Sequence, residues 1–108
     1  MIHLSFYVPV KDAQRVKNAM FEAGAGKIGN YDFCSFDIKG IGQFRPLAGS
    51  HPTIGSENQL EQVEELKVEM VLEDKVLTQV IEALKANHPY ETPAYYAIKT
   101  LSLSDPLL

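Results

Sequence analysis

The sequence has few of the features that mark a disulfide-bonded, membrane-spanning or nucleic-acid-binding protein. Cys34 is the one cysteine in 108 residues, so no disulfide can form within the chain, and a reducing cytoplasm is the expected compartment. No apolar run approaches the roughly 20 residues that a membrane-spanning helix needs, and the N-terminus lacks the basic segment that opens a signal peptide. Lys and Arg are scattered, and the net charge is −4. We therefore expect a soluble cytoplasmic protein that binds neither a membrane nor nucleic acid.

Common catalytic and cofactor signatures are also missing. The glycines at 24, 26 and 29 follow a predicted helix instead of opening one, so they do not form a dinucleotide fingerprint. No spacing of histidine and cysteine is typical of zinc. Cys34 lies in an apolar alternation, which favours a buried structural thiol over a nucleophile. The sequence therefore leaves catalysis uncertain and favours a protein that is not an enzyme.

The sequence does contain clear periodic patterns. Residues 2–10 alternate between apolar and polar side chains with period two, which predicts a strand with one buried face. Three more strands are predicted at 31–40, 62–73 and 91–101, and two helices at 11–26 and 75–89.

Details of these patterns predict orientations and helix starts. In the second strand Cys34, Phe36 and Ile38 are the more apolar set, so we expect them to face the core. Asp12 and Asp74 stand where a helix start is expected, and Asp74 is predicted to be an N-cap. The acidic side chains at 57, 61, 64 and 65 are expected to form a solvated face.

The predicted element order is β-α-β-β-α-β. Two right-handed halves of this kind give a ferredoxin-like α+β sandwich, in which a four-stranded antiparallel sheet carries two helices on one face. We expect one domain over residues 1–101, with a long β2–β3 excursion at 40–57 and a C-terminal tail at 102–108. The other face of such a sheet is left bare, which favours association into an oligomer.

The stretch HPYETPAYYA, residues 88–97, is the most unusual part of the chain. Pro89 can end the helix and Pro93 can fix the entry to the last strand. His88 and Glu91 could also face one cleft and serve as a metal pair or an acid–base pair. His51 stands in a second His-Pro pair within the excursion, which is interleaved with apolar residues. Both interpretations of the stretch stay open at this point.

Three motifs together resemble the YqfO-type domain of Nif-three-like proteins, which are relatives of the NGG-interacting factor. They are GAGKIGNYDFCSF at 24–36, GIGQFRPLAGSHPTIG at 40–55 and HPYETPAYYAI at 88–98, and the resemblance covers roughly residues 1–101. It implies a fold similar to CutA and the PII signalling proteins, which assemble as trimers with their sheets inside. In PII-like proteins the loop between the second and third strands carries ligand and partner contacts, and residues 40–55 match it here.

The resemblance has limits. Nif-three-like proteins carry a two-metal site in a flanking domain, to which no residue of these 108 corresponds, so we expect the hydrolase chemistry not to carry over. Tyr96 also departs from the family, in which a polar residue more often follows the first tyrosine of the last strand.

We therefore expect a non-catalytic, oligomeric CutA/PII-like module, a trimer by analogy, that binds a small ligand, a metal ion or a protein partner. A small metal-dependent hydrolase of the cyclohydrolase type and a purely structural interaction domain are the alternatives. A divalent metal ion is the one cofactor considered, with His88, Glu91 and His51 as its ligands. The residues expected to line one ligand-binding region are Asn30, Tyr31, Arg45, His51, His88, Tyr90 and Glu91.

Overall fold

The computed structural model describes residues 1–101, and the predicted tail at 102–108 lies outside them. The element order is the predicted one, and both helices begin with a short 3-10 turn, at Val10–Asp12 and Asp74–Val76. The strands are β1 (Ile2–Pro9), β2 (Phe36–Phe44), β3 (Glu61–Leu72) and β4 (Tyr95–Lys99), and the α-helices are α1 (Ala13–Glu22) and α2 (Leu77–Asn87).

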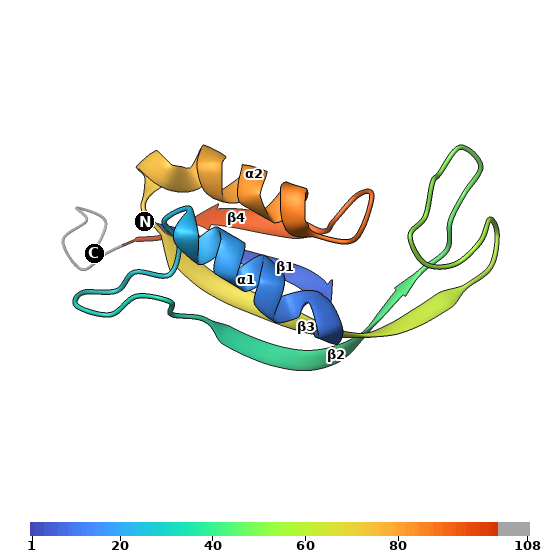
Figure 1. Ribbon diagram of the computed structural model, residues 1–108, viewed down its shortest axis with the longest axis horizontal. Coiled ribbons are helices and arrows are strands. Elements are labelled where there is room, and N and C mark those ends of the chain that lie inside the picture. Colours follow the sequence, from blue (N-terminus) through green and yellow to red (C-terminus); the bar gives the residue numbers. More distant parts are fainter. Residues whose placement is uncertain (102–108) are drawn as a thin grey trace.

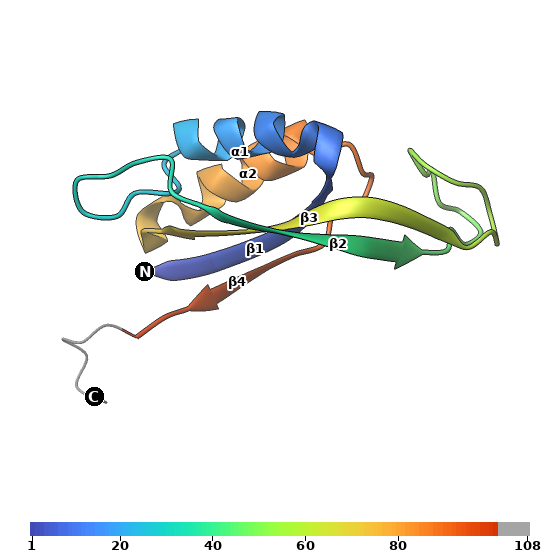
Figure 2. The same ribbon diagram turned by 90° about the horizontal axis from the view of Figure 1, so that it is seen from below.

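The four strands form one antiparallel sheet in the order β2-β3-β1-β4. In the centre of the sheet, Phe6 pairs with Val68 of β3 on one side and with Tyr95 of β4 on the other. Both helices lie on the same face of the sheet, and the opposite face is uncovered (Figure 2). The predicted ferredoxin-like α+β fold is therefore confirmed.

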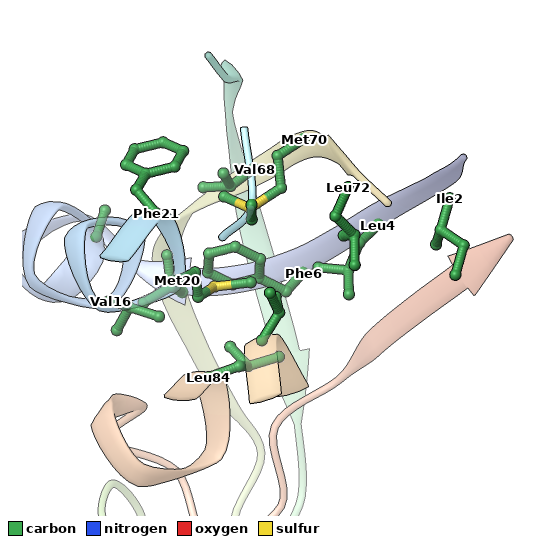
Figure 3. Packing of buried hydrophobic residues seen from close by; sticks show 14 residues of the cluster. Ile2, Leu4, Phe6, Val16, Met20, Phe21, Val68, Met70, Leu72 and Leu84 are labelled. Carbon is green, nitrogen blue, oxygen red and sulfur yellow. The ribbon is translucent and has the colours of Figure 1, made fainter. Parts of the chain in front are cut away.

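The core lies between the helices and the sheet. Leu4 and Phe6 of β1, together with Val68 of β3, are completely buried, as the alternation predicted. Met20 of α1 and Leu84 of α2 close the core from the helix side (Figure 3). Burying each such side chain contributes about 1.5–3 kcal/mol, so this layer provides the main stabilisation of the chain.

The orientation of β2 was predicted wrongly. Asp37 pairs with the buried Val68 and receives a 2.7 Å hydrogen bond from Lys17 of α1, so the polar set faces the helices. Phe36 and Ile38 face the uncovered side and are 66% and 43% exposed. The apolar set was assigned to the core because one buried face was assumed, whereas β2 is an edge strand that buries neither face in the single chain.

Asp12 stands at the N-cap position of α1, where a helix start was predicted, whereas Asp74 does not cap α2 as predicted. Asp12 makes no side-chain capping hydrogen bond, and its carboxylate accepts from Arg15 instead. Asp74 lies in the 3-10 turn that precedes α2, where it pairs with the Met1 ammonium group and with Lys99, at 3.0 Å each. These ion pairs lower the pKa of Asp74, since Lys99 and the terminal ammonium both favour the carboxylate.

Strands β2 and β3 continue past the other two strands and carry a loop at their far end (Figure 1). We call residues 40–64 the arm. Because β2 runs to Phe44 and β3 begins at Glu61, the irregular connection is 45–60 and not 40–57. The arm gives the molecule its long axis of 49 Å. The loop that joins α1 to β2 lies at the opposite end of that axis (Figures 1 and 2).

Candidate functional site

His88 follows the last residue of α2 and is held from both sides of its ring. Its Nε2 lies 2.7 Å from the carbonyl oxygen of Tyr7, and its Nδ1 lies 3.1 Å from the backbone nitrogen of Tyr90. A carbonyl oxygen can only accept, so Nε2 carries the proton and Nδ1 accepts from the Tyr90 N–H. Both ring nitrogens are therefore engaged in holding the turn after α2 against β1.

Burial sets the charge state of this histidine. His88 is 7% exposed, and burial lowers its pKa below the ordinary value of 6.5. The hydrogen bond to Tyr7 and the nearby carboxylates of Glu65 and Asp12 oppose this shift, and Arg15 adds to it. The imidazole is consequently neutral at neutral pH, which its accepting Nδ1 requires.

Tyr90 brings Glu65 of β3 into the same region. The Tyr90 hydroxyl donates to Glu65 Oε2 at 3.0 Å, and its ring lies 6.0 Å from that of Phe44. Burial first, and then this hydrogen bond and the Glu65 charge, raise the pKa of Tyr90, so the phenol stays protonated and remains a donor. Glu65 is half-buried, which corrects the prediction of a solvated acidic face at this position.

Gly42 of β2 lies directly beneath the Glu65 carboxylate. A Cβ atom at this glycine would collide with Glu65 Oε1 and would lie 2.6 Å from Cδ. The absence of a side chain at Gly42 therefore makes the space in which the carboxylate rests.

Two hydrogen bonds fasten the loop of the arm to the turn after α2. The backbone N–H of His51 donates to Glu91 Oε2 at 2.9 Å, and Thr53 Oγ1 donates to the Pro89 carbonyl at 2.6 Å. We call this pair the clasp. It joins residues 36 to 40 positions apart in the sequence and closes the arm over the 88–91 corner.

A pocket with a volume of about 730 Å³ lies between the arm and the corner, and Thr53 and Glu91 of the clasp are among its lining residues. That volume is within the range of small-molecule sites. Its walls are largely apolar, and its polar groups include the two carboxylates of Glu65 and Glu91 and one guanidinium, that of Arg45. Its apolar lining includes Ile41, Phe44, Leu47, Pro52, Ile54 and Ala94.

The structure brings together some of the predicted site residues. Arg45, Tyr90 and Glu91 line the pocket. His88 lies behind Tyr90, and its ring centroid is 4.9 Å from that of the tyrosine. His51 contributes its backbone N–H to the clasp.

Asn30 and Tyr31 lie apart from this group. They belong to the loop that joins α1 to β2, at the other end of the molecule (Figure 1), where Ile28 and Tyr31 form an isolated bridge. A single chain therefore does not place Asn30 and Tyr31 in the region expected for them.

Two residues of this region were not predicted from the sequence to belong to it. Glu65 looked like one member of an acidic run, and Asp12 looked like a helix start. Asp12 is 7% exposed; Arg15 donates to its Oδ1 at 3.0 Å, and its Oδ2 has no hydrogen-bond partner among residues 1–101. Arg15 also donates to the Asn87 carbonyl at 2.9 Å, which ties α1 to the end of α2. The sequence does contain a signal for the position of Glu65. Glu65 precedes Leu66 in a strand of period two, so the Glu65 side chain is expected on the sheet face opposite the helices.

The proposed metal ligands do not form a metal cluster in a single chain. Both nitrogens of His88 are occupied, and Glu91 accepts from the backbone of His51. Within residues 1–101, no group of three histidine, cysteine, aspartate or glutamate side chains is arranged to hold a metal ion.

Cys34 is half-buried, which corrects the expectation of a buried thiol. It lines a smaller hollow of about 270 Å³ with His3 and Glu69, whose side chains lie 3.5 Å apart. Cys34 donates weakly to the Asp32 carbonyl at 3.5 Å.

The uncovered face of the sheet carries apolar side chains along both edges. Phe36 and Ile38 lie along β2, while Tyr96 and Ile98 lie along β4 and are 58% and 60% exposed. The pairing of Tyr96 with Ser5 and of Ile98 with His3 places them on the same face as the β2 pair. The strip between the edges is more polar, with Lys67 and Glu69 among its residues.

Comparison with known proteins supports the fold and the resemblance. No family model matches the chain. A protein of Halalkalibacterium halodurans named GTP cyclohydrolase 1 type 2 homolog is 45% identical over 92 residues, which cover 85% of this chain and 25% of that protein. A Bacillus cereus protein related to NIF3 has a TM-score of 0.77 at 38% identity over 90% of this chain and 24% of its own. The chain thus spans about a quarter of the length of these relatives.

More distant structures match almost end to end. CutA1 of Pyrococcus horikoshii has a TM-score of 0.69 at 16% identity over 99% of this chain and 90% of its own. The PII-like protein CutA of Nostoc has a TM-score of 0.66 at 13% identity, covering 93% and 81%. Because these identities are low, the similarity concerns the fold.

The strand order, the helices on one face (Figure 2) and these neighbours define a ferredoxin-like domain in the fold class of CutA and PII-like proteins. Within that class, the motifs and the 45% identity make this chain a YqfO-type relative of the Nif-three-like proteins, homologous to a segment of about a quarter of their length. Within the described part of the chain, no helix is long and apolar enough to cross a membrane.

Proposed function

We propose that the chain is a non-catalytic module that assembles with copies of itself, as a trimer, and binds a small ligand in the pocket under the arm. The observation that carries the proposal is the pair of apolar edges on the uncovered sheet face. Exposed apolar surface of this kind marks an interaction site. The trimers implied by the resemblance to CutA and PII proteins agree with this assembly.

The placement of the apolar residues favours a ring over a two-fold dimer. Phe36 and Ile38 lie on one edge strand, and Tyr96 and Ile98 lie on the other. If the β2 edge of one copy packs against the β4 edge of the next, the contact is heterologous, and such contacts form a ring when the rotation between copies closes. Three copies would then cover all six edges.

Ligand binding is the second part of the proposal. The pocket has an apolar lining, a few convergent polar groups and a wall that the clasp fixes. The cyclohydrolase activity in the name of the longer relatives refers to proteins of which this chain covers a quarter, and we do not assign it here.

The assembly is tested by placing a charge on one edge. Ile38→Lys puts an ammonium group into the contact that β2 would make, and we expect it to convert the trimer to single chains at micromolar concentration. Thr78→Lys adds the same charge on the exposed surface of α2 and should leave the assembly unchanged. Molar mass by light scattering after gel filtration provides the readout, with circular dichroism to establish that both variants fold. An Ile38→Lys variant that keeps the wild-type oligomeric mass would contradict the proposed interface.

A further inference from the structure

We propose that the pocket under the arm takes a small organic cation, an amine on an aromatic or apolar body, with the Glu65 carboxylate as its counter-ion. This inference rests on the ligand binding proposed above, because it names the chemical class of that ligand.

The first argument is the state of the Glu65 carboxylate. Its Oε2 accepts the Tyr90 hydroxyl, and no lysine, arginine or histidine within the described residues forms an ion pair with it. Glu65 is half-buried and lines the pocket. A carboxylate in this position has remaining acceptor capacity, and an ammonium group is the donor that complements its charge.

The second argument is that the chain makes room for this carboxylate. Gly42 leaves open the space into which Glu65 Oε1 projects, and any larger residue would displace that oxygen. The Tyr90 hydroxyl then holds the other oxygen. The open space at Gly42 and the hydrogen bond from Tyr90 therefore position the acceptor before a ligand arrives, which reduces the ordering cost of binding.

The third argument is the surroundings of the carboxylate. Phe44 and Tyr90 place two aromatic rings at the pocket, with centroids 6.0 Å apart, and aromatic faces attract cations. Glu91 adds a second carboxylate to the lining. Arg45, which is exposed, is the one positively charged side chain among the lining residues that the structure describes. The two carboxylates of the described lining thus outnumber its one guanidinium, and the walls are largely apolar.

Three small molecules with one common body separate the alternatives. Tyramine carries an ammonium group, 4-ethylphenol is its uncharged counterpart, and 4-hydroxyphenylacetate carries a carboxylate. Each is titrated into the isotopically labelled full chain while the backbone amide resonances are followed. We expect tyramine to shift the resonances of Gly42, Phe44 and Tyr90, and to bind at least about tenfold more tightly than the other two, as loss of a charged hydrogen bond in a partly buried site implies.

The variants Glu65→Gln and Glu64→Gln form a matched pair. Glu64 is the neighbouring residue on β3, and it is exposed and does not line the pocket. Glu65→Gln should weaken tyramine binding by about tenfold or more, whereas Glu64→Gln should leave it unchanged. If Glu65→Gln does not fold, the comparison of the three molecules on the wild-type chain still decides the question.

The outcomes distinguish this inference from the proposal on which it rests. Equal binding of tyramine and 4-ethylphenol, tighter binding of the carboxylate, or unchanged tyramine binding by Glu65→Gln would overturn the cation assignment while leaving a ligand pocket in place. If none of the three molecules shifts the resonances of the pocket residues, the cation assignment is likewise overturned. Molar mass measured on the same samples reports separately whether the proposed assembly holds.

Discussion

At the scale of single residues, the corner after α2 is organised by a neutral histidine. His88 donates to Tyr7 and accepts from Tyr90, so protonation of Nδ1 would set two N–H groups against each other. The acidic groups that face it are Asp12 and Glu65, and the basic one is Arg15. The structure therefore assigns His88 a role in holding the corner, and its metal-binding role stays a prediction.

This arrangement predicts a pH dependence of stability. The folded pKa of His88 is lowered, so the unfolded chain takes up a proton more readily. The stabilisation by neutral His88 is complete above its ordinary pKa of 6.5 and is lost as the pH falls from there towards the folded pKa. We expect His88→Gln to cost about 2 kcal/mol at neutral pH, since two hydrogen bonds worth about 1 kcal/mol each are disturbed. The variant should also show less loss of stability than the wild type between about pH 7 and pH 5.5.

Urea unfolding at the two pH values measures both effects. His51→Gln is the control, because the His51 side chain is exposed and the clasp uses its backbone N–H. A His88→Gln variant that lost stability on acidification as steeply as the wild type would show that another group causes the dependence.

The sequence predicted this corner only in part. Pro89 correctly indicated the end of the second helix, since α2 ends at Asn87. The partners of His88 and Tyr90 could not be read from the sequence, because Tyr7 and Glu65 are 81 and 25 residues away and meet them through tertiary packing. Glu65 was missed for the same reason.

At the scale of elements, the least predictable parts were β2 and the arm. The period of two predicted for β2 is correct, but the predicted orientation of the strand is not. Its apolar side chains face away from the helices, as the pairing of Asp37 with Val68 shows. The assumption that apolar residues lie in the core of their own chain fails for side chains that a second chain would bury. The arm is a two-stranded extension, which is marginal by itself in water, so the clasp is expected to determine how rigid it is.

The clasp can be tested by removing one of its hydrogen bonds. Thr53→Val keeps the shape of the side chain and deletes the donor to the Pro89 carbonyl. We expect amide exchange over residues 47–57 to become several-fold faster, which corresponds to about 1 kcal/mol for one hydrogen bond. Hydrogen–deuterium exchange with mass spectrometry provides the measurement.

Thr78→Val makes the same chemical change on the surface of α2 and should leave exchange in the arm unaffected. Unchanged exchange in Thr53→Val would mean that the arm is held by something other than the clasp.

At the scale of the whole molecule, the chain has one well-packed side and one uncovered side. The core between the helices and the sheet follows the alternation in β1 and β3, and this part of the fold could be predicted from the sequence. The separation of the uncovered apolar residues onto two edges depends on the strand order β2-β3-β1-β4, which places residues 36–44 and 95–99 on opposite sides. Because the apolar side chains lie on two different edge strands, a contact between copies would join unlike edges, and this favours a ring.

The mass of the wild-type chain in solution decides whether the proposed trimer forms. Sedimentation equilibrium over a range of micromolar concentrations should give three times the 12.0 kDa of one chain. A mass of 12.0 kDa across that range would show that the apolar edges do not join copies of this chain, and would overturn the proposed assembly.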